Sequence, residues 1–215
     1  MNILGIESSS KKCCIALNID GKLHTLSSKS INNSATSLPQ MVQELLESHS
    51  ITFNTLDGIA ISIGPGSFTG LRVGLSYAKG LSLSLNIPII PVSTFDILFF
   101  PNTVDLKNEH VTVLIHSHGR TVYAQEYSLK EGFYIAKDKP KSILLDNIKT
   151  NSKECIFYCG PENLIEFISN ISSIVKHVSP SVSDVVGIGL QNFDLLKTKS
   201  INNLVPNYVG SFNTG

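Results

Sequence analysis

Residues 61–74 read Ile61-Ser62-Ile63-Gly64-Pro65-Gly66-Ser67-Phe68-Thr69-Gly70-Leu71-Arg72-Val73-Gly74. The stretch begins in an apolar run of strand length, 58–63, and passes through a glycine turn into a predicted helix over 69–85. Gly64 and Gly66 can adopt backbone angles closed to other residues, and Pro65 restricts the turn between them. From these residues alone, a tight strand-to-helix turn of an α/β fold is the favoured interpretation.

The same turn has the chemistry of an anion site. Ser67 and Thr69 offer hydroxyls and backbone N–H groups at the positive end of the predicted helix. The turn is not a P-loop, because Lys79 lies too far downstream and no Gly-Lys-Ser/Thr follows the glycines.

Three antiparallel strands are predicted at the N-terminus, over 2–7, 13–18 and 22–28, with Asp20-Gly21 as the hairpin turn. An amphipathic helix over 38–48 follows, because apolar residues recur there at helical spacing: Leu38, Met41, Val42, Leu45 and Leu46. We expect Thr36 or Ser37 to be its N-cap and Pro39 to lie in its first turn.

The second half repeats this order of elements. Strands are predicted over 111–115 and 121–127, then a strand over 156–159, a helix over 161–169, a strand over 174–178 and a helix over 181–196. No repeat is visible in the residues themselves. The order nevertheless predicts an internally duplicated α/β architecture with one lobe over 1–104 and a second over 105–215.

Composition excludes several classes of protein. Seventeen basic residues balance seventeen acidic ones at a pI near 7.0, so the chain has no basic field that would hold a polyanion without help. The spacings among Cys13, Cys14, Cys155 and Cys159 fit no zinc or thioredoxin signature. The apolar runs are too short for a membrane span or a signal peptide, so we expect a cytoplasmic protein.

The stretch over 64–74 resembles the hallmark of the TsaB/YeaZ family, which reads GPGSFTG-[LV]-R-[VI]-G. The residues over 3–9 are similar to the family's opening I-L-x-I-D-T-S, and Leu56-Asp57 and Val92-Ser93-Thr94 fall where the family has equivalents. The resemblance covers residues 2–95 well. It covers the second half loosely, through Val122-Tyr123 and Pro206-Asn207-Tyr208.

The resemblance implies an actin/Hsp70/sugar-kinase-like (ASKHA) fold of two RNase H-like lobes. It also implies a non-catalytic accessory subunit that docks onto a TsaD-like enzyme. That enzyme holds the metal and transfers threonylcarbamoyl to adenosine 37 of tRNA. A TsaE-like ATPase is expected in the full complex, and a homodimer when the chain is alone. The tRNA is expected to be contacted indirectly, through the complex.

Two sets of residues follow from the resemblance. The partner interface is expected on the helices over 38–48 and 69–85, where small residues would also permit close helix contact: Leu38, Met41, Val42, Leu45, Gly70, Val73, Gly74, Tyr77, Ala78 and Leu81. The motif loop, with a weak or interface-shared ATP or ADP contact left open, comprises Glu7, Ser8, Ser9, Gly64, Pro65, Gly66, Ser67, Thr69 and Arg72. No catalytic residue, metal ligand or required cofactor is predicted.

The chain departs from the family pattern at three places. Glu7 stands where members often carry Asp, and Ser34 where they often carry His. His116-Ser117-His118 replaces a common Asp-Ala-Arg. These departures put a nucleotide or metal role of this chain in doubt.

The residues bear on two alternative functions. A metal-dependent enzyme is disfavoured because no two histidines lie four residues apart, and His116 with His118 supplies only two ligands. An ATP-binding ASKHA-type enzyme or chaperone-like protein outside tRNA modification could use Glu7 with the serines over 8–10. The second lobe, however, offers no Asp-Gly phosphate signal.

Overall fold

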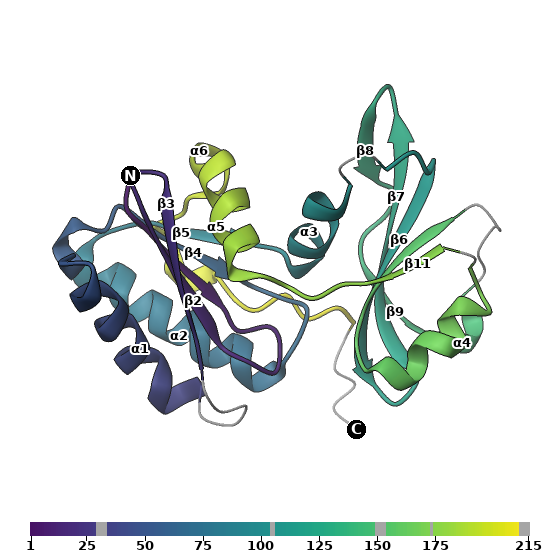
Figure 1. Cartoon of the computed structure of the whole chain (residues 1–215), viewed down its shortest axis with the longest axis horizontal. Coiled ribbons are helices and arrows are strands. Elements are labelled where there is room, and N and C mark those ends of the chain that lie inside the picture. The colour runs from purple at the N-terminus through teal and green to yellow at the C-terminus, as the bar shows by residue number, and fades with distance from the viewer. Residues whose placement is uncertain (29–33, 104–105, 149–153, 173, 211–215) are drawn as a thin grey trace. The chain divides into compact units, whose positions relative to one another are not determined.

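A computed structural model describes residues 1–28, 34–103, 106–148, 154–172 and 174–210, with only the backbone described for residues 34–36. The chain forms two compact units, the first comprising Met1–Ile97 and Pro180–Asn207, the second Leu98–Ser179 and the chain from Tyr208 (Figure 1). This division differs from the lobes expected over 1–104 and 105–215. The difference arises because the chain returns after residue 179 and packs its last long helix on the first sheet.

The first unit is built on a five-stranded sheet in the order β3-β2-β1-β4-β5. Its strands are β1 Ile3–Glu7, β2 Cys14–Ile19, β3 Lys22–Ser27, β4 Gly58–Ser62 and β5 Ile89–Val92. The three antiparallel strands predicted at the N-terminus are present, and β4 and β5 extend the sheet in parallel with β1.

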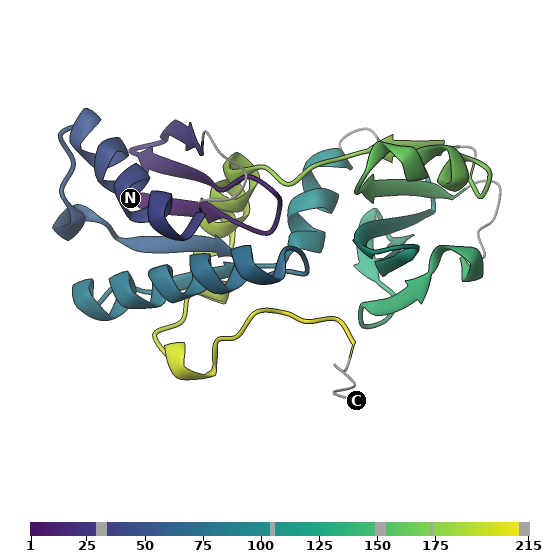
Figure 2. The same ribbon diagram turned by 90° about the horizontal axis from the view of Figure 1, so that it is seen from below.

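Helices cover both faces of this sheet (Figure 2). Helices α1 Ser34–Ser48 and α2 Phe68–Leu85 pack over Leu4, Ile6 and their neighbours, and α5 Val182–Gln191 packs over the opposite face. Because side chains alternate along a strand, β1 contributes to both cores. Short segments complete the unit: the 3₁₀ turns Phe53–Thr55 and Ile201–Asn203 and the helix α6 Phe193–Leu196.

Two predicted helix boundaries were wrong. Helix α1 begins at Ser34, so Thr36 and Ser37 lie inside it and Pro39 falls in its second turn. The single helix predicted over 181–196 is divided at Asn192, where α5 ends and α6 begins. Within the described residues, no helix combines the length and apolar character needed to cross a membrane.

The second unit holds a six-stranded sheet in the order β11-β10-β6-β7-β8, with β9 also paired to β7. Its strands are β6 His110–His118, β7 Thr121–Lys130, β8 Phe133–Ala136, β9 Lys141–Leu144, β10 Cys155–Cys159 and β11 Ile174–His177. Its helical segments are the helix α4 Ile165–Ser169 and the 3₁₀ turns Phe100–Asn102, Leu145–Asn147 and Glu162–Leu164. Helix α3 Thr94–Phe99 contains the boundary between the two units. Strands β8 and β9 were not predicted from the sequence.

The two sheets have the same topology, which confirms the duplicated ASKHA-type architecture. Strands β6, β7, β8, β10 and β11 occupy the places of β1, β2, β3, β4 and β5, with the same parallel and antiparallel neighbours. The structure also reveals residues that recur at equivalent places. Asp20-Gly21 forms the turn between β2 and β3, with positive φ angles of 48° and 86°. Glu131-Gly132 forms the turn between β7 and β8, with positive φ angles of 49° and 85°. Gly64-Pro65 follows β4, and Gly160-Pro161 follows β10, the strand in the equivalent place.

Candidate functional site

The glycine turn between β4 and α2 is bound to three distant segments through its backbone. The Ser67 N–H donates to the Ser9 carbonyl at 2.7 Å, and the Thr94 N–H donates to the Gly64 carbonyl at 2.8 Å. The Asn207 N–H donates to the Ile63 carbonyl at 2.7 Å. Gly64 has a φ of +105°, which L side chains rarely adopt. The turn therefore fixes where α2 leaves the sheet.

Three glycines of the motif pack closely against the chain's own Ser8-Ser9 segment. A Cβ atom on Gly66 would lie 2.3 Å from the Ser9 carbonyl oxygen, and one on Gly70 would lie 2.1 Å from the Ser8 carbonyl oxygen. A Cβ atom on Gly74 would lie 2.3 Å from Ser8 Oγ. At Gly66 and Gly70 the close atom is a backbone oxygen that cannot rotate away, so a side chain at either position would push the turn or α2 away from this segment. Gly70 and Gly74, which were expected to contact a partner helix closely, thus make their close contact within the chain.

The N-terminus of α2 uses several of its own polar groups. Ser67 is the N-cap, and its Oγ accepts a hydrogen bond from the Gly70 N–H at 3.2 Å. The Leu71 N–H donates to the Ser67 carbonyl at 2.9 Å. Ser67 and Thr69 are exposed, and the Arg72 guanidinium carbon lies 3.6 Å from the centroid of the Phe68 ring.

Glu7, at the end of β1, is closed off from solvent. Its side chain is 0% exposed, and its Oε1 accepts hydrogen bonds from the Ser9 N–H at 2.7 Å and the Ser9 hydroxyl at 2.6 Å. Burial raises the pKa of Glu7, and hydrogen bonds from Ser9 and Ser62 only partly oppose this effect. Among the described residues Glu7 Oε2 has no hydrogen-bond partner, nor do Ser8 Oγ and Thr94 Oγ1.

The nine predicted loop residues therefore do not form one open site. Glu7, Ser8, Ser9, Gly64 and Pro65 are buried, Gly66 is half-buried, and Ser67, Thr69 and Arg72 are exposed. The buried carboxyl and the exposed hydroxyls lie in different environments, because the Ser8-Ser9 segment is packed directly against α2.

Most of the predicted interface residues belong to the core of the first unit. Seven of the ten are buried there, which corrects their assignment to a surface: Leu38, Met41, Val42, Leu45, Gly70, Gly74 and Ala78. The interface was expected from the family resemblance, whereas the apolar side of each helix packs on the helices' own sheet. Val73, Tyr77 and Leu81 are only half-buried, and burial raises the pKa of Tyr77 to about 12.

The outer face of α2 is exposed to solvent and includes Gly80, one of the small residues from which close helix contact was expected. Ser76, Gly80 and Ser84 are exposed along it, and Leu83 is 71% exposed. In the eighteen residues of α2 only Arg72 and Lys79 are charged. Surface helices usually carry a charged outer face, so the scarcity of charge was the signal available in the sequence.

His116 and His118, which depart from the family pattern, contact a backbone carbonyl and a neighbouring hydroxyl. His116 Nε2 lies 3.1 Å from the Gly119 carbonyl, and His118 Nδ1 lies 3.1 Å from Ser117 Oγ. Within the part of the chain that the structure describes, no three His, Cys, Asp or Glu side chains are grouped closely enough for a metal ion. Ser34 begins α1, and its side chain lies outside the description.

A surface hollow lies away from the motif loop, at the amino ends of β1, β4 and β5. It is lined by Met1, Asp57, Pro88, Phe193, Lys197, Thr198 and Lys199. Ligands of open α/β sheets bind at the carboxyl ends of the strands, where Glu7 and the glycine turn lie. None of the predicted site residues lines this hollow.

Known proteins resemble the chain along most of its length. Residues 28–152 match the family model described as TsaD, tRNA N6-adenosine threonylcarbamoyltransferase. A tRNA threonylcarbamoyladenosine biosynthesis protein TsaB from Buchnera aphidicola subsp. Acyrthosiphon pisum is 33% identical over 207 residues, covering 93% of this chain and 91% of the relative. The same-named protein from Buchnera aphidicola subsp. Baizongia pistaciae is 28% identical over 220 residues, covering 96% and 97%. The structure titled YeaZ from Pseudomonas aeruginosa superposes with a TM-score of 0.80 at 21% identity, covering 97% of this chain and 99% of that one, and supports the fold.

Proposed function

The chain belongs to the TsaB family of tRNA threonylcarbamoyladenosine biosynthesis, and from this premise we propose that it is an accessory, non-catalytic subunit. In this proposal it docks onto a TsaD-like enzyme and supports threonylcarbamoyl transfer to adenosine 37 of tRNA. A TsaE-like ATPase joins the full complex, which works in the cytoplasm, and two copies pair when the chain is alone.

The observation that carries the docking role is the outer face of α2. Ser76, Gly80 and Ser84 are small and uncharged and the exposed Leu83 is apolar, so another helix can approach this part of the face closely without burying an unpaired charge. Val73, Tyr77 and Leu81 lie half-buried beside that face and supply apolar surface at helical spacing. Burial of such apolar surface is the main favourable term in protein association.

The environment of Glu7 supports a non-catalytic role. A catalytic carboxylate must reach the proton or metal on which it acts. Glu7 is fully buried and hydrogen-bonded to Ser9, and burial raises the pKa of its carboxyl. The packing of Gly66 and Gly70 against Ser8-Ser9 leaves no room for a ligand at that contact.

Gly80→Glu tests the docking face directly. A Cβ atom on Gly80 meets nothing within 4 Å, so the substitution places a charge on the face without disturbing the fold. We expect affinity for the TsaD-like subunit to fall at least tenfold, about 1.4 kcal/mol, because docking would bury an unpaired carboxylate. Titration of the purified subunits, with sizing of the complex, measures this change.

Gly187→Glu is the matched control, because Gly187 is a helical glycine on α5 whose Cβ would also meet nothing within 4 Å. Both variants should keep the wild-type circular dichroism spectrum, and Gly187→Glu should keep wild-type affinity. Undiminished docking of a folded Gly80→Glu protein would place the interface elsewhere.

An ATP-binding enzyme is the second candidate, favoured by the exposed hydroxyls of Ser67 and Thr69 at the start of α2. The Ser67 and Gly70 N–H groups are already bonded to Ser9 and Ser67, so we expect no nucleotide affinity that depends on Thr69. Calorimetric titration of the isolated wild-type and Thr69→Val chains with ADP should give indistinguishable heats. Tight binding that Thr69→Val abolishes would support the enzyme instead.

A further inference from the structure

The β7–β8 hairpin of the second unit presents an exposed aromatic and aliphatic pair beside a lysine. Phe133 is 76% exposed and Ile135 is 51% exposed. In the antiparallel register Phe133 is opposite Lys130, and Ile135 is opposite Ser128. Cross-strand partners project from the same side of a sheet, so these residues share one face.

Tyr134, between the two exposed residues, points to the other side and anchors the strand. Its hydroxyl donates a hydrogen bond to the Asn108 carbonyl at 2.8 Å, and its ring packs edge-on against Phe99 with the centroids 5.3 Å apart. The hairpin turn at Glu131-Gly132 has both φ angles positive, as a tight two-residue turn requires. Phe133 and Ile135 are thus fixed in an outward position by the backbone that carries them.

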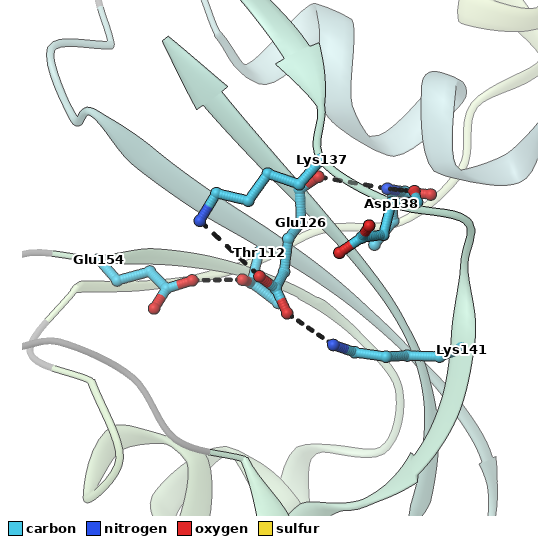
Figure 3. Close-up of polar contacts among 7 residues, drawn as sticks. Thr112, Glu126, Lys137, Asp138, Lys141 and Glu154 are labelled. Atoms are coloured by element: carbon cyan, nitrogen blue, oxygen red, sulfur yellow. Dashed lines mark hydrogen bonds and ion pairs between the residues drawn. The ribbon is translucent and has the colours of Figure 1, made fainter.

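Lys137, in the segment that joins β8 to β9, and Lys141, at the start of β9, both reach Glu126 of β7 (Figure 3). Glu126 binds between Lys141 Nζ at 2.9 Å and Lys137 Nζ at 3.8 Å, and the Lys141 hydrogen bond is the main reason that the pKa of Glu126 is lowered. The Lys137 N–H donates to the Glu126 carbonyl at 2.9 Å, and Gln125 Nε2 donates to the Asp138 carbonyl at 2.7 Å. These bonds hold the segment against β7.

The segment over 130–141 therefore combines exposed lysines, of which Lys137 and Lys141 are held by Glu126, with outward apolar side chains. It holds four lysines, at 130, 137, 139 and 141, and two acids, Glu131 and Asp138, and together with Glu126, which pairs with two of these lysines, the net charge is 4 − 3 = +1. All four lysines are exposed, in a chain whose overall charge is zero. An exposed aromatic ring among lysines is the arrangement by which proteins stack bases and contact phosphates of single-stranded nucleic acid.

We propose that Phe133, Ile135 and the lysines at 130, 137, 139 and 141, here called the Phe133 face, contact unpaired nucleotides of tRNA directly. A base would stack on Phe133 while Lys130 and Lys139 contact the flanking phosphates. RNA is favoured over an acidic protein surface because every base offers a flat face to Phe133, and because the family acts in tRNA modification. The inference rests on that place in tRNA chemistry and is independent of docking through α2. It replaces the indirect contact with tRNA that the family resemblance implies.

Binding of an unmodified, fluorescently labelled tRNA transcript by the isolated full chain, measured by fluorescence anisotropy at 20 mM and 150 mM salt, tests the proposal. Phe133→Ala should weaken binding at least about fivefold, the loss expected for one base stack. The double variant Lys130→Ala/Lys139→Ala should reduce the slope of log affinity against log salt by about 1.4, or about 0.7 per phosphate contact.

Two matched controls alter exposed residues of the same kinds in the first unit. Leu83→Ala removes an apolar side chain that is 71% exposed on α2, and Lys22→Ala removes an exposed lysine on β3. Both should bind the transcript as the wild type does. An RNA duplex of equal length, which lacks unpaired bases, should be insensitive to Phe133→Ala.

Three results would overturn the proposal: no binding of the transcript by the wild type at 20 mM salt, equal affinity of wild type and Phe133→Ala, or equal loss with Leu83→Ala. Binding of the TsaD-like subunit, measured in parallel, should be unchanged in Phe133→Ala. Loss of that binding with unchanged RNA affinity would make the Phe133 face a protein contact and would also overturn the proposal.

Discussion

Replacement of Gly70 by alanine is expected to lower the free energy of unfolding by about 3 kcal/mol. The added Cβ atom would lie 2.1 Å from the Ser8 carbonyl oxygen, and both residues are buried. A backbone oxygen cannot rotate away as a side chain can, so relief requires α2 or the end of β1 to move. Equilibrium denaturation of wild type and Gly70→Ala by urea measures the loss.

Gly80→Ala in the same helix is the control for the intrinsic effect of the substitution. Gly80 is exposed and its Cβ would meet nothing within 4 Å, so alanine should stabilise α2 by about 0.5–1 kcal/mol. The two substitutions are chemically identical and should differ in sign. A neutral or stabilising effect of Gly70→Ala would show that α2 and the Ser8-Ser9 segment can move apart without lowering the free energy of unfolding.

The motif glycines show what a residue pattern can predict. Their spacing indicates that another chain segment approaches α2 closely, and this is correct. It does not identify the segment, because Ser8-Ser9 is about sixty residues away in the sequence and no local periodicity links it to Gly70. Gly66 is a second example, because it has no unusual φ angle and the carbonyl group and Cβ atom of Ser9 exclude a side chain there.

The strands of the first unit were predicted well, because β1, β2 and β4 are short apolar runs bounded by turn residues. Strands β8 and β9 were missed because Phe133–Ala136 and Lys141–Leu144 lie at the sheet edge and lack a buried apolar alternation. The place of α5 in the first unit was also unpredictable from local pattern. Its contacts with Ile3 and Ala16 join residues far apart in the sequence.

The role of Glu7 depends on burial that the residues around it do not reveal. A carboxylate followed by serines at the end of an apolar strand fits a phosphate loop, and this was one of the interpretations left open by the sequence. The structure shows a fully buried carboxyl bonded to Ser9, with its second oxygen lacking a hydrogen-bond partner in the described residues. Burial of this kind makes the folded state sensitive to the protonation of Glu7.

Glu7→Gln is expected to make the protein more stable than wild type at pH 8, because an amide replaces a buried carboxyl whose pKa is raised by burial. Burial raises the pKa of Glu7 above its ordinary value of 4.5, so the folded state favours the neutral carboxyl. An amide is neutral at every pH. Its oxygen can accept the hydrogen bonds from Ser9, and the Ser62 hydroxyl can turn to accept from its N–H group.

The pH dependence identifies the cause. Below pH 4.5 the carboxyl is protonated in both the folded and unfolded wild type, so the stabilisation from the raised pKa is fully present and the variant has little advantage. As the pH rises, the unfolded chain releases its proton first, and the wild type loses stability until the pH passes the folded pKa. The advantage of Glu7→Gln should therefore grow from pH 4.5 to pH 8 in urea denaturation curves.

Glu44→Gln, which removes an exposed carboxyl on α1, corrects for the change in net charge. Parallel stability curves for wild type and Glu7→Gln over this range would mean that the folded state accommodates the ionised carboxylate without penalty.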